Sequence, residues 1–132
     1  MRDYQPRRNN KYILPTPVYH QTVWLIRDYD RICGELEDIM VSSPDPSDGL
    51  PRAANQTDEV FTKAARRETL LARKEAIDTA LGKVPVEYRT GIWDNVQLRR
   101  SFPNDAARAT YGKWKSRFIY EVAITMGLVD KK

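Results

Sequence analysis

The sequence has 132 residues but only one cysteine, Cys33, and one histidine, His20. A single cysteine excludes an internal disulfide, and these two residues alone cannot supply the usual His/Cys metal site within one chain. They stand thirteen positions apart on a predicted helix, so they cannot act on it as neighbouring groups. We therefore predict neither a bound metal nor another cofactor.

Long apolar runs and clustered glycines are also missing. No run of about 18 apolar residues exists, so no transmembrane helix is predicted, and the N-terminal residues lack the apolar core of a signal peptide. Gly82, Gly91 and Gly112 stand singly, which argues against a Gly-rich phosphate loop. Carboxylate pairs such as Glu35 with Asp38 fit an ordinary charged helix surface. We expect a cytoplasmic protein that is not an enzyme.

Charge is abundant, and it is unevenly distributed. Hydrophobic residues make up 41% and charged residues 30%, which favours long, solvated helices around one core. The formal net charge of +4 divides into +3 for residues 1–16, −3 for 17–83, −1 for 84–98 and +5 for 99–132. Basic ends suit attraction to a phosphate backbone, although two solvated basic termini explain the charge alone equally well.

The first half of the chain predicts a basic arm and a long helix. Residues 1–16 are polar and basic, as in a loose arm. Thr16 can cap the helix, Pro17 suits its first position, and Gly34 is its weak point. Apolar positions follow the alternating four- and three-residue spacing of a heptad seam, which needs another helix to cover it. They are Val18, Thr22, Leu25, Tyr29, Ile32, Leu36 and Ile39.

A second long helix is predicted over residues 57–83, after a Pro- and Ser-rich loop at residues 42–55. Thr57 or Asp58 can cap it. Its apolar pattern is weaker and consists of Val60, Phe61, Ala64, Leu70, Leu71, Ile77, Leu81 and Val84. The two helices most simply form an antiparallel hairpin over residues 17–83. The seam at residues 18–39 could equally pair with a second copy, and we therefore expect a homo-oligomer.

Residues 84–132 predict a short helix, a break and a last helix. Pro85 suits the first turn of the short amphipathic helix. Pro103 breaks the chain, and Asn104 or Asp105 caps the last helix. That helix is expected to end near residue 126, with Gly127 left-handed and Leu128 packing back. Its apolar stripe consists of Trp114, Phe118, Val122 and Met126, with Tyr111 one turn earlier.

Arginine and lysine gather on this last helix and just before it. A helix in the major groove contacts base edges with its N-terminal turns and phosphates with flanking basic side chains. We predict phosphate contacts for Arg99, Arg100, Arg108 and Lys113. Contacts with base edges or the groove are predicted for Thr110, Tyr111, Lys115 and Arg117. Trp114 and Phe118 are predicted to belong to the core, because they lie on the apolar stripe.

A family resemblance extends over nearly the whole chain, from Tyr12 to Leu128. The ordered segments that carry it are YILPTPVYHQTVWLIRDYDR, SSPDPSDGLPR, VPVEYRTGIWDN and TYGKWKSRFIYEVAITMGL. In this order they resemble the RinA-type family of phage transcriptional activators, and the plan is similar to that of ArpU-type regulators. PVEYRTGIWDN and TYGKWKSRF are the most specific pieces.

This resemblance implies a phage or prophage protein that binds promoter DNA and activates late genes for packaging and virion assembly. It also implies a C-terminus similar to region 4 of bacterial sigma factors. Pro85, Glu87 and Arg89 match its first motif, and the run Lys115, Ser116 and Arg117 matches its recognition helix. The chain departs from the pattern in the connection, where SFPNDAARA stands in place of the usual middle helix.

The combined prediction is an all-α protein in which a long antiparallel hairpin carries a sigma-region-4-like helix-turn-helix. Double-stranded DNA is the expected partner, and RNA polymerase is a candidate for direct contact. Two other functions stay open. One is a DNA-packaging recognition protein that resembles a small terminase subunit, and the other is an interaction module that binds protein and never contacts DNA.

Overall fold

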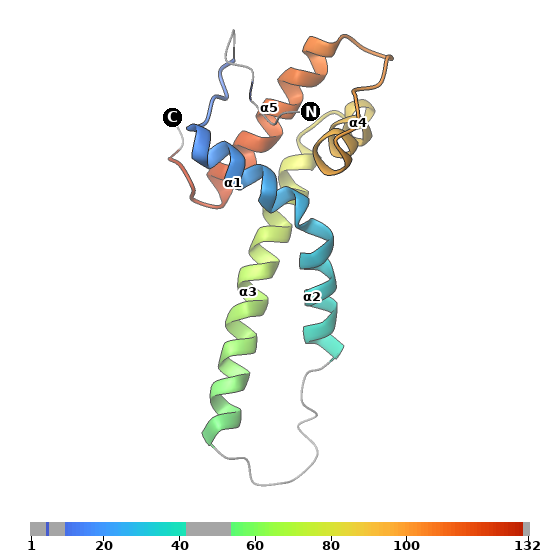
Figure 1. Ribbon diagram of the computed structural model, residues 1–132. Coiled ribbons are helices and arrows are strands. Elements are labelled where there is room, and N and C mark those ends of the chain that lie inside the picture. The colour runs from blue at the N-terminus through green and yellow to red at the C-terminus, as the bar shows by residue number, and fades with distance from the viewer. Residues whose placement is uncertain (1–4, 6–9, 42–53, 131–132) are drawn as a thin grey trace.

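The chain folds into helices throughout its described part. The computed structural model describes residue 5 and residues 10–41 and 54–130, and for residues 54–59 the backbone alone. These residues form five helices and no strand, which confirms the all-α prediction (Figure 1). The helices are α1 (Thr16–Arg27), α2 (Tyr29–Val41), α3 (Ala54–Gly82), α4 (Val86–Leu98) and α5 (Arg108–Thr125).

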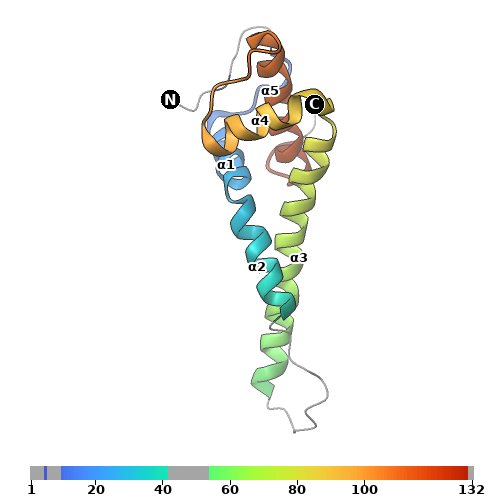
Figure 2. The same ribbon diagram turned by 90° about the vertical axis from the view of Figure 1, so that its right-hand side faces the viewer.

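The molecule consists of a head and a projecting stalk (Figures 1 and 2). The head contains α1, α4, α5 and the C-terminal end of α3. The stalk contains α2 and the remainder of α3, which lie side by side and run in opposite directions. Because α3 belongs to both parts, it fixes the position of the stalk relative to the head.

The first long helix is interrupted at Asp28, so the prediction of one continuous helix is wrong. Asp28 has backbone angles of φ −85° and ψ 2°, and its carboxylate accepts a hydrogen bond from Arg31 Nε at 2.7 Å. Gly34, the predicted weak point, lies within α2. Helix α1 begins at Thr16 after Pro15, without a side-chain cap, so Thr16 is not the cap. Pro17 lies in the first turn as predicted.

The head has one core, to which every helix of the head contributes. Tyr19, Val23 and Ile26 of α1 are buried against residues of the other helices and of the segment between α3 and α4. Those residues include Ile77, Ala80, Val84, Ile92, Val96, Tyr111, Phe118, Ile119, Val122 and Ala123. The core therefore joins residues from both sides of the predicted division between residues 17–83 and 84–132.

A smaller core holds the stalk together. Ile32 and Leu36 of α2 and Leu70 of α3 are buried there, and Ile39 and Leu71 pack against them. Three residues of the seam at residues 18–39, Thr22, Ile32 and Leu36, are thus buried within the chain, and the other four are partly buried. Pairing of this seam with a second copy stays a prediction.

Helix α3 begins at Ala54, three residues before the predicted start. Thr57 and Asp58 therefore lie inside the helix rather than at its cap. Val60, Phe61 and Ala64 were predicted as part of its apolar pattern, but all three are exposed. The short stalk core ends before it reaches them.

The end of α5 agrees with its prediction. Gly127 has a φ of 72°, and its N–H donates to the carbonyl of Ile124 at 3.0 Å. The N–H of Leu128 donates to the carbonyl of Ala123 at 3.0 Å, and Leu128 packs on the head core. These two hydrogen bonds form a Schellman motif, which satisfies carbonyls at the helix end.

Described residues of the N-terminal arm are packed against the head, although a loose arm was predicted. Leu14 is fully buried, and its backbone N–H donates to Gln5 Oε1 at 3.0 Å. Tyr12 lies against Tyr120 of α5 with a ring-centroid distance of 5.3 Å. Apolar and aromatic residues hidden among the basic ones give this segment its contacts.

Candidate nucleic-acid interface

The connection between α4 and α5 covers residues 99–107 and contains no helix. The missing middle helix of the sigma pattern is therefore missing in the structure as well. Helix α4 ends at Leu98, and Arg99 adopts the left-handed region with a φ of 56°. Asn95 Nδ2 donates to the carbonyl of Arg100 at 2.6 Å, which fixes the chain as it leaves α4.

Two predicted details of this connection are wrong. Pro103 does not end the helix, because α4 has already ended at Leu98. Asn104 and Asp105 do not cap α5, whose N-cap position is Ala107 without a side-chain hydrogen bond. Asp105 has a different partner, the hydroxyl of Tyr111.

Gly91 allows the connection to pass close over α4. A Cβ atom at Gly91 would lie 2.8 Å from Pro103 Cδ and 2.8 Å from Tyr111 Cε1. Such distances are shorter than normal contacts, so a side chain would push the connection and α5 away from α4. This glycine in the GIW segment was seen in the sequence only as an isolated residue.

Tyr111 holds the connection to α5 and cannot contact DNA. Its ring is fully buried, stacks on Phe102 at 5.2 Å and meets Tyr88 edge-on at 5.2 Å. Its hydroxyl donates to Asp105 Oδ1 at 2.5 Å. This hydrogen bond and burial raise the pKa of Tyr111 to about 12. The predicted groove role of Tyr111 is therefore wrong, because the residue belongs to the core.

Arg89 anchors α4 to the end of α3. Its Nε donates to the carbonyl of Val84 at 2.7 Å, and its Nη2 donates to the carbonyl of Gly82 at 2.8 Å. A guanidinium is well suited to carbonyls at a helix C-terminus, where negative partial charge gathers. The last residue of the Pro-Glu-x-Arg motif thus has a structural role here.

A reciprocal pair of hydrogen bonds joins α1 to α4. Arg27 Nε donates to the carbonyl of Val96 at 2.8 Å, close to the end of α4. In return, Gln97 Nε2 donates to the carbonyl of Ile26 at the end of α1. Each helix supplies a donor for the other helix's C-terminal carbonyls, so α4 is held firmly on the head.

The outward face of α5 carries Thr110, Lys113 and Arg117. Spacings of three and four residues place them on one side of the helix. Lys113 is exposed, and Thr110 and Arg117 are half-buried. Trp114 lies beside them, with Lys113 Nζ at 5.7 Å and the Arg117 guanidinium at 5.6 Å from its ring centroid. These cation–π contacts hold two basic groups next to an aromatic surface.

The N-terminal arm covers part of this face. The Arg117 guanidinium lies 5.9 Å from the ring of Tyr12, so it stands between Tyr12 and Trp114. Its Nε is buried and has no hydrogen-bond partner among the described residues. Asn10 Nδ2 donates to Ser116 Oγ at 3.3 Å, and Ser116 is buried. Of the residues predicted to contact base edges or the groove, Arg117 is therefore held in place by the arm.

Lys115 points away from this face. Its ammonium lies 6.0 Å from the ring of Phe102, in the connection. Successive helical residues are about 100° apart, which places Lys113 and Lys115 on nearly opposite sides of α5. The three residues of the Lys-Ser-Arg run therefore lie in different places: Lys115 is near the connection, Ser116 is buried, and Arg117 is on the outward face with Lys113.

Three further predicted residues, Arg99, Arg100 and Arg108, are exposed. Arg99 lies beside Trp24 of α1, with its guanidinium 5.7 Å from the ring centroid, and Arg27 lies on the same ring at 5.0 Å. Trp24 is 57% exposed. Trp24 was not among the predicted site residues, so its position beside the basic connection was missed.

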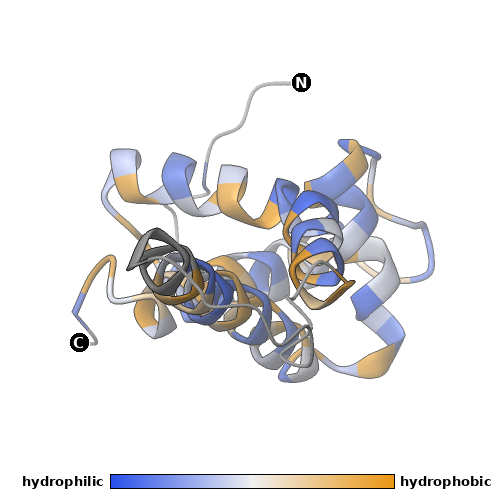
Figure 3. Ribbon diagram, turned by 90° about the horizontal axis from the view of Figure 1, so that it is seen from below, coloured by the Kyte–Doolittle hydropathy of each residue, from blue (hydrophilic) through white to orange (hydrophobic). Residues whose placement is uncertain are grey.

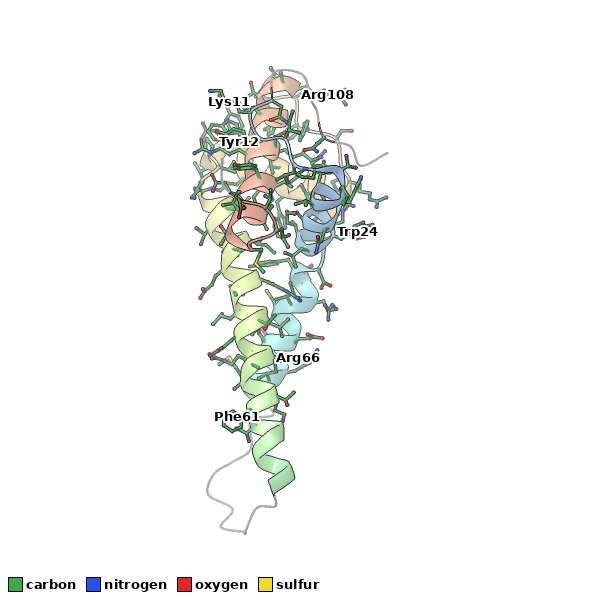
Figure 4. All side chains as sticks on the ribbon, turned by 90° about the vertical axis from the view of Figure 1, so that its left-hand side faces the viewer. Lys11, Tyr12, Trp24, Phe61, Arg66 and Arg108 are labelled. Carbon is green, nitrogen blue, oxygen red and sulfur yellow. The ribbon has the colours of Figure 1, made fainter. Side chains whose placement is uncertain are left out.

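Residues 99–117 contain six basic residues and one acidic residue, Asp105, which is bound to Tyr111. Arg100, Arg108 and Lys113 form no ion pair with another residue of the described part of the chain. Arg108, Lys11 and Tyr12 all lie in the head, and Arg108 and Lys11 lie near its end away from the stalk (Figure 4). Arg100, Arg108 and Lys113 therefore give the surface of the head positive charge that no described carboxylate pairs with.

Other kinds of site have little support in the described residues. They contain no group of three or more His, Cys, Asp or Glu residues arranged to hold a metal. His20 lies against the ring of Tyr19 at 5.5 Å, and Cys33 is a half-buried free thiol. Within the same residues, no helix is long and apolar enough to cross a membrane.

Comparison of the whole chain with protein-family models, with curated proteins and with solved structures finds no match.

Proposed function

We propose that this protein binds double-stranded DNA through α5 and the connection before it, and that it activates transcription of late phage genes. The observation that carries the proposal is the basic surface formed by Arg99, Arg100, Arg108 and Lys113. Arg100, Arg108 and Lys113 form no ion pair with another described residue. Such basic groups are suited to neutralise phosphates, because they replace condensed cations on the DNA. The activator role rests on the resemblance to RinA-type proteins.

The proposed reading element is the N-terminal half of α5, held by α4 as in a sigma-type helix-turn-helix. Gly91, Tyr111 and Arg89 fix α4, α5 and the nine-residue connection relative to one another. This rigid support is what base recognition requires of a groove helix. Thr110 and Arg117 are the proposed base or groove contacts, and Arg99, Arg100, Arg108 and Lys113 are the proposed phosphate contacts.

A matched pair of lysine variants tests DNA binding. Lys113→Ala should weaken binding to DNA that flanks the protein's own gene by about fivefold, because it removes one charged contact. Lys74→Ala makes the same change in net charge. Since Lys74 belongs to α3 and pairs with Asp78 of the same helix at 2.7 Å, outside α5 and the connection, the affinity of this variant should be unchanged. Equal affinities of both variants and the wild type in fluorescence anisotropy would contradict the proposed surface.

A promoter–reporter assay separates transcription activation from DNA packaging. If the protein alone increases expression from a phage late promoter, and Lys113→Ala reduces that increase, the activator role is supported. Specific DNA binding without any effect on the reporter would favour a packaging protein. Absence of DNA binding at low salt would favour a protein-interaction module.

A further inference from the structure

The stalk carries apolar side chains that its own core does not use. Met40 and Val41 at the end of α2 are 68% and 87% exposed, and Val60 and Phe61 of α3 are 46% and 70% exposed. Figure 3 looks along the stalk, where α2 ends in hydrophobic residues, and Figure 4 shows Phe61 far from the head. These side chains leave the lower stalk with an apolar surface.

Helix α3 has two different faces in this region. Leu70 and Ile77, seven residues apart, are buried and mark the side that faces the two cores. Val60, Ala64, Arg67 and Leu71 follow a spacing of four, three and four residues, so they share another face. The first three are exposed, and Leu71 is partly buried at the edge of the stalk core, against which it packs. This second face, which we call the outer stripe, has the spacing of a helix-packing seam.

Charge at the middle of the outer stripe is not neutralised within the chain. Neighbouring basic side chains have partners, since Arg66 pairs with Glu35 at 2.9 Å and Lys74 pairs with Asp78 at 2.7 Å. Arg67 and Glu68, adjacent in sequence and both exposed, have no hydrogen bond or ion pair with another described residue. The outer stripe therefore carries one unpaired positive charge, Arg67, and one unpaired negative charge, Glu68, stands beside it.

We infer that the outer stripe binds a second copy of this chain, with the two α3 helices antiparallel around a twofold axis between residues 67 and 68. Arg67 of each copy then faces Glu68 of the other, and Ala64 of each copy faces Leu71 of the other. A twofold interface must be self-complementary in this reciprocal way. Parallel, in-register pairing would bring Arg67 against Arg67, which is repulsive.

The same arrangement agrees with the shape of the molecule. Because the two α3 helices run in opposite directions, the heads lie at opposite ends of the pair. The basic surface of each head therefore stays uncovered. The dimer contact does not depend on the proposed DNA binding, so either can fail without the other.

Charge reversal in the full-length protein tests the reciprocal pairs. Arg67→Glu places glutamates opposite each other twice, and Glu68→Arg does the same with arginines. Each single variant should weaken dimerisation by about tenfold or more in sedimentation velocity, because two attractions become two repulsions. Asp38→Arg, an exposed residue of α2, is the control and should dimerise like the wild type.

Mixing the two single variants gives the decisive result. An equimolar mixture of Arg67→Glu and Glu68→Arg should form a heterodimer about as stable as the wild-type dimer, since unlike charges then meet at both pairs. Both substitutions use strong helix formers, and circular dichroism checks that the fold is kept. A wild-type protein that stays monomeric throughout the micromolar range would overturn the inference. So would a mixture that dimerises no better than its components.

Discussion

At the scale of single residues, Tyr111 shows how one position can be assigned to the wrong surface. It precedes Phe118 by seven residues, and both are buried. That spacing placed Tyr111 on the apolar stripe, yet its polar hydroxyl and basic neighbours suggested a groove contact. The structure resolves the conflict, because the hydroxyl has a local partner in Asp105. The sequence did not predict that Asp105 is this partner, because Asp105 lies in an irregular connection.

The Tyr111–Asp105 hydrogen bond predicts alkaline sensitivity. This bond and burial in the folded state raise the pKa of Tyr111 to about 12, whereas an unfolded tyrosine ionises near its ordinary pKa of about 10. The unfolded chain then loses the proton first, so the free energy of unfolding should fall between pH 10 and about 12.

Urea unfolding of the wild type and Tyr111→Phe across this pH range measures the effect. The variant should show a smaller decline. Some decline should remain, because desolvation and the hydrogen bond to Asp78 also raise the pKa of Tyr29. Parallel pH profiles of the two proteins would show that Tyr111 does not contribute.

Substitution of alanine for Gly34 and for Gly91 should have opposite effects on the free energy of unfolding. At Gly91 a Cβ atom would collide with Pro103 and Tyr111, whereas at Gly34 nothing lies within 4 Å of it. Gly34→Ala should therefore increase the free energy of unfolding by about 0.5–1 kcal/mol, because alanine is the better helix former. Gly91→Ala should lower it by about 1–3 kcal/mol through overpacking.

Chemical denaturation of both glycine variants makes the comparison. A stabilised Gly91→Ala protein would mean that the connection does not lie against α4 as described. The same measurement on Gly34→Ala serves as the reference for the helix-propensity term alone.

At the scale of helices, the apolar periodicity predicted the buried faces better than the sequence predicted where the helices begin and end. The apolar stripes of α1, α2 and α5 were recognised correctly because their core contacts repeat along the helix. The break at Asp28 was not, since aspartate is compatible with a helix and the local bend depends on how α1 and α2 pack on different partners. The predicted N-caps were wrong for a related reason. Thr16 and Asn104 are residue types that often cap helices, but α1 and α5 have their N-cap positions at Pro15 and Ala107.

The stalk predicts a contrast between two residues of α2. Leu36 is buried with Ile32 and Leu70, whereas Met40 is 68% exposed. Leu36→Ala should lower the free energy of unfolding by about 2–4 kcal/mol, because it removes core contacts and leaves a cavity. Met40→Ala should change it by less than about 0.5 kcal/mol in the monomer. Thermal or urea unfolding at low protein concentration distinguishes the two, and equal losses would contradict the described stalk core.

At the scale of the whole molecule, the structure separates a basic head from an extended stalk. Sequence charge identified residues 99–132 as basic, but it did not show that the N-terminal arm lies on α5. The contacts of Asn10 with Ser116 and of Tyr12 with Arg117 join positions about a hundred residues apart. Long-range contacts of this kind have no local pattern. The likeness to a sigma module could likewise be seen in two motifs but not in the connection between them.

The most direct test of DNA binding through the head is the salt dependence of affinity. For the wild type, the dissociation constant for duplex DNA should rise steeply between about 50 and 200 mM salt, linearly on a double-logarithmic plot. Arg108→Ala combined with Lys113→Ala should reduce the magnitude of that slope by about two, since two phosphate contacts are removed. An unchanged slope, or no binding of the wild type at 50 mM salt, would contradict the account.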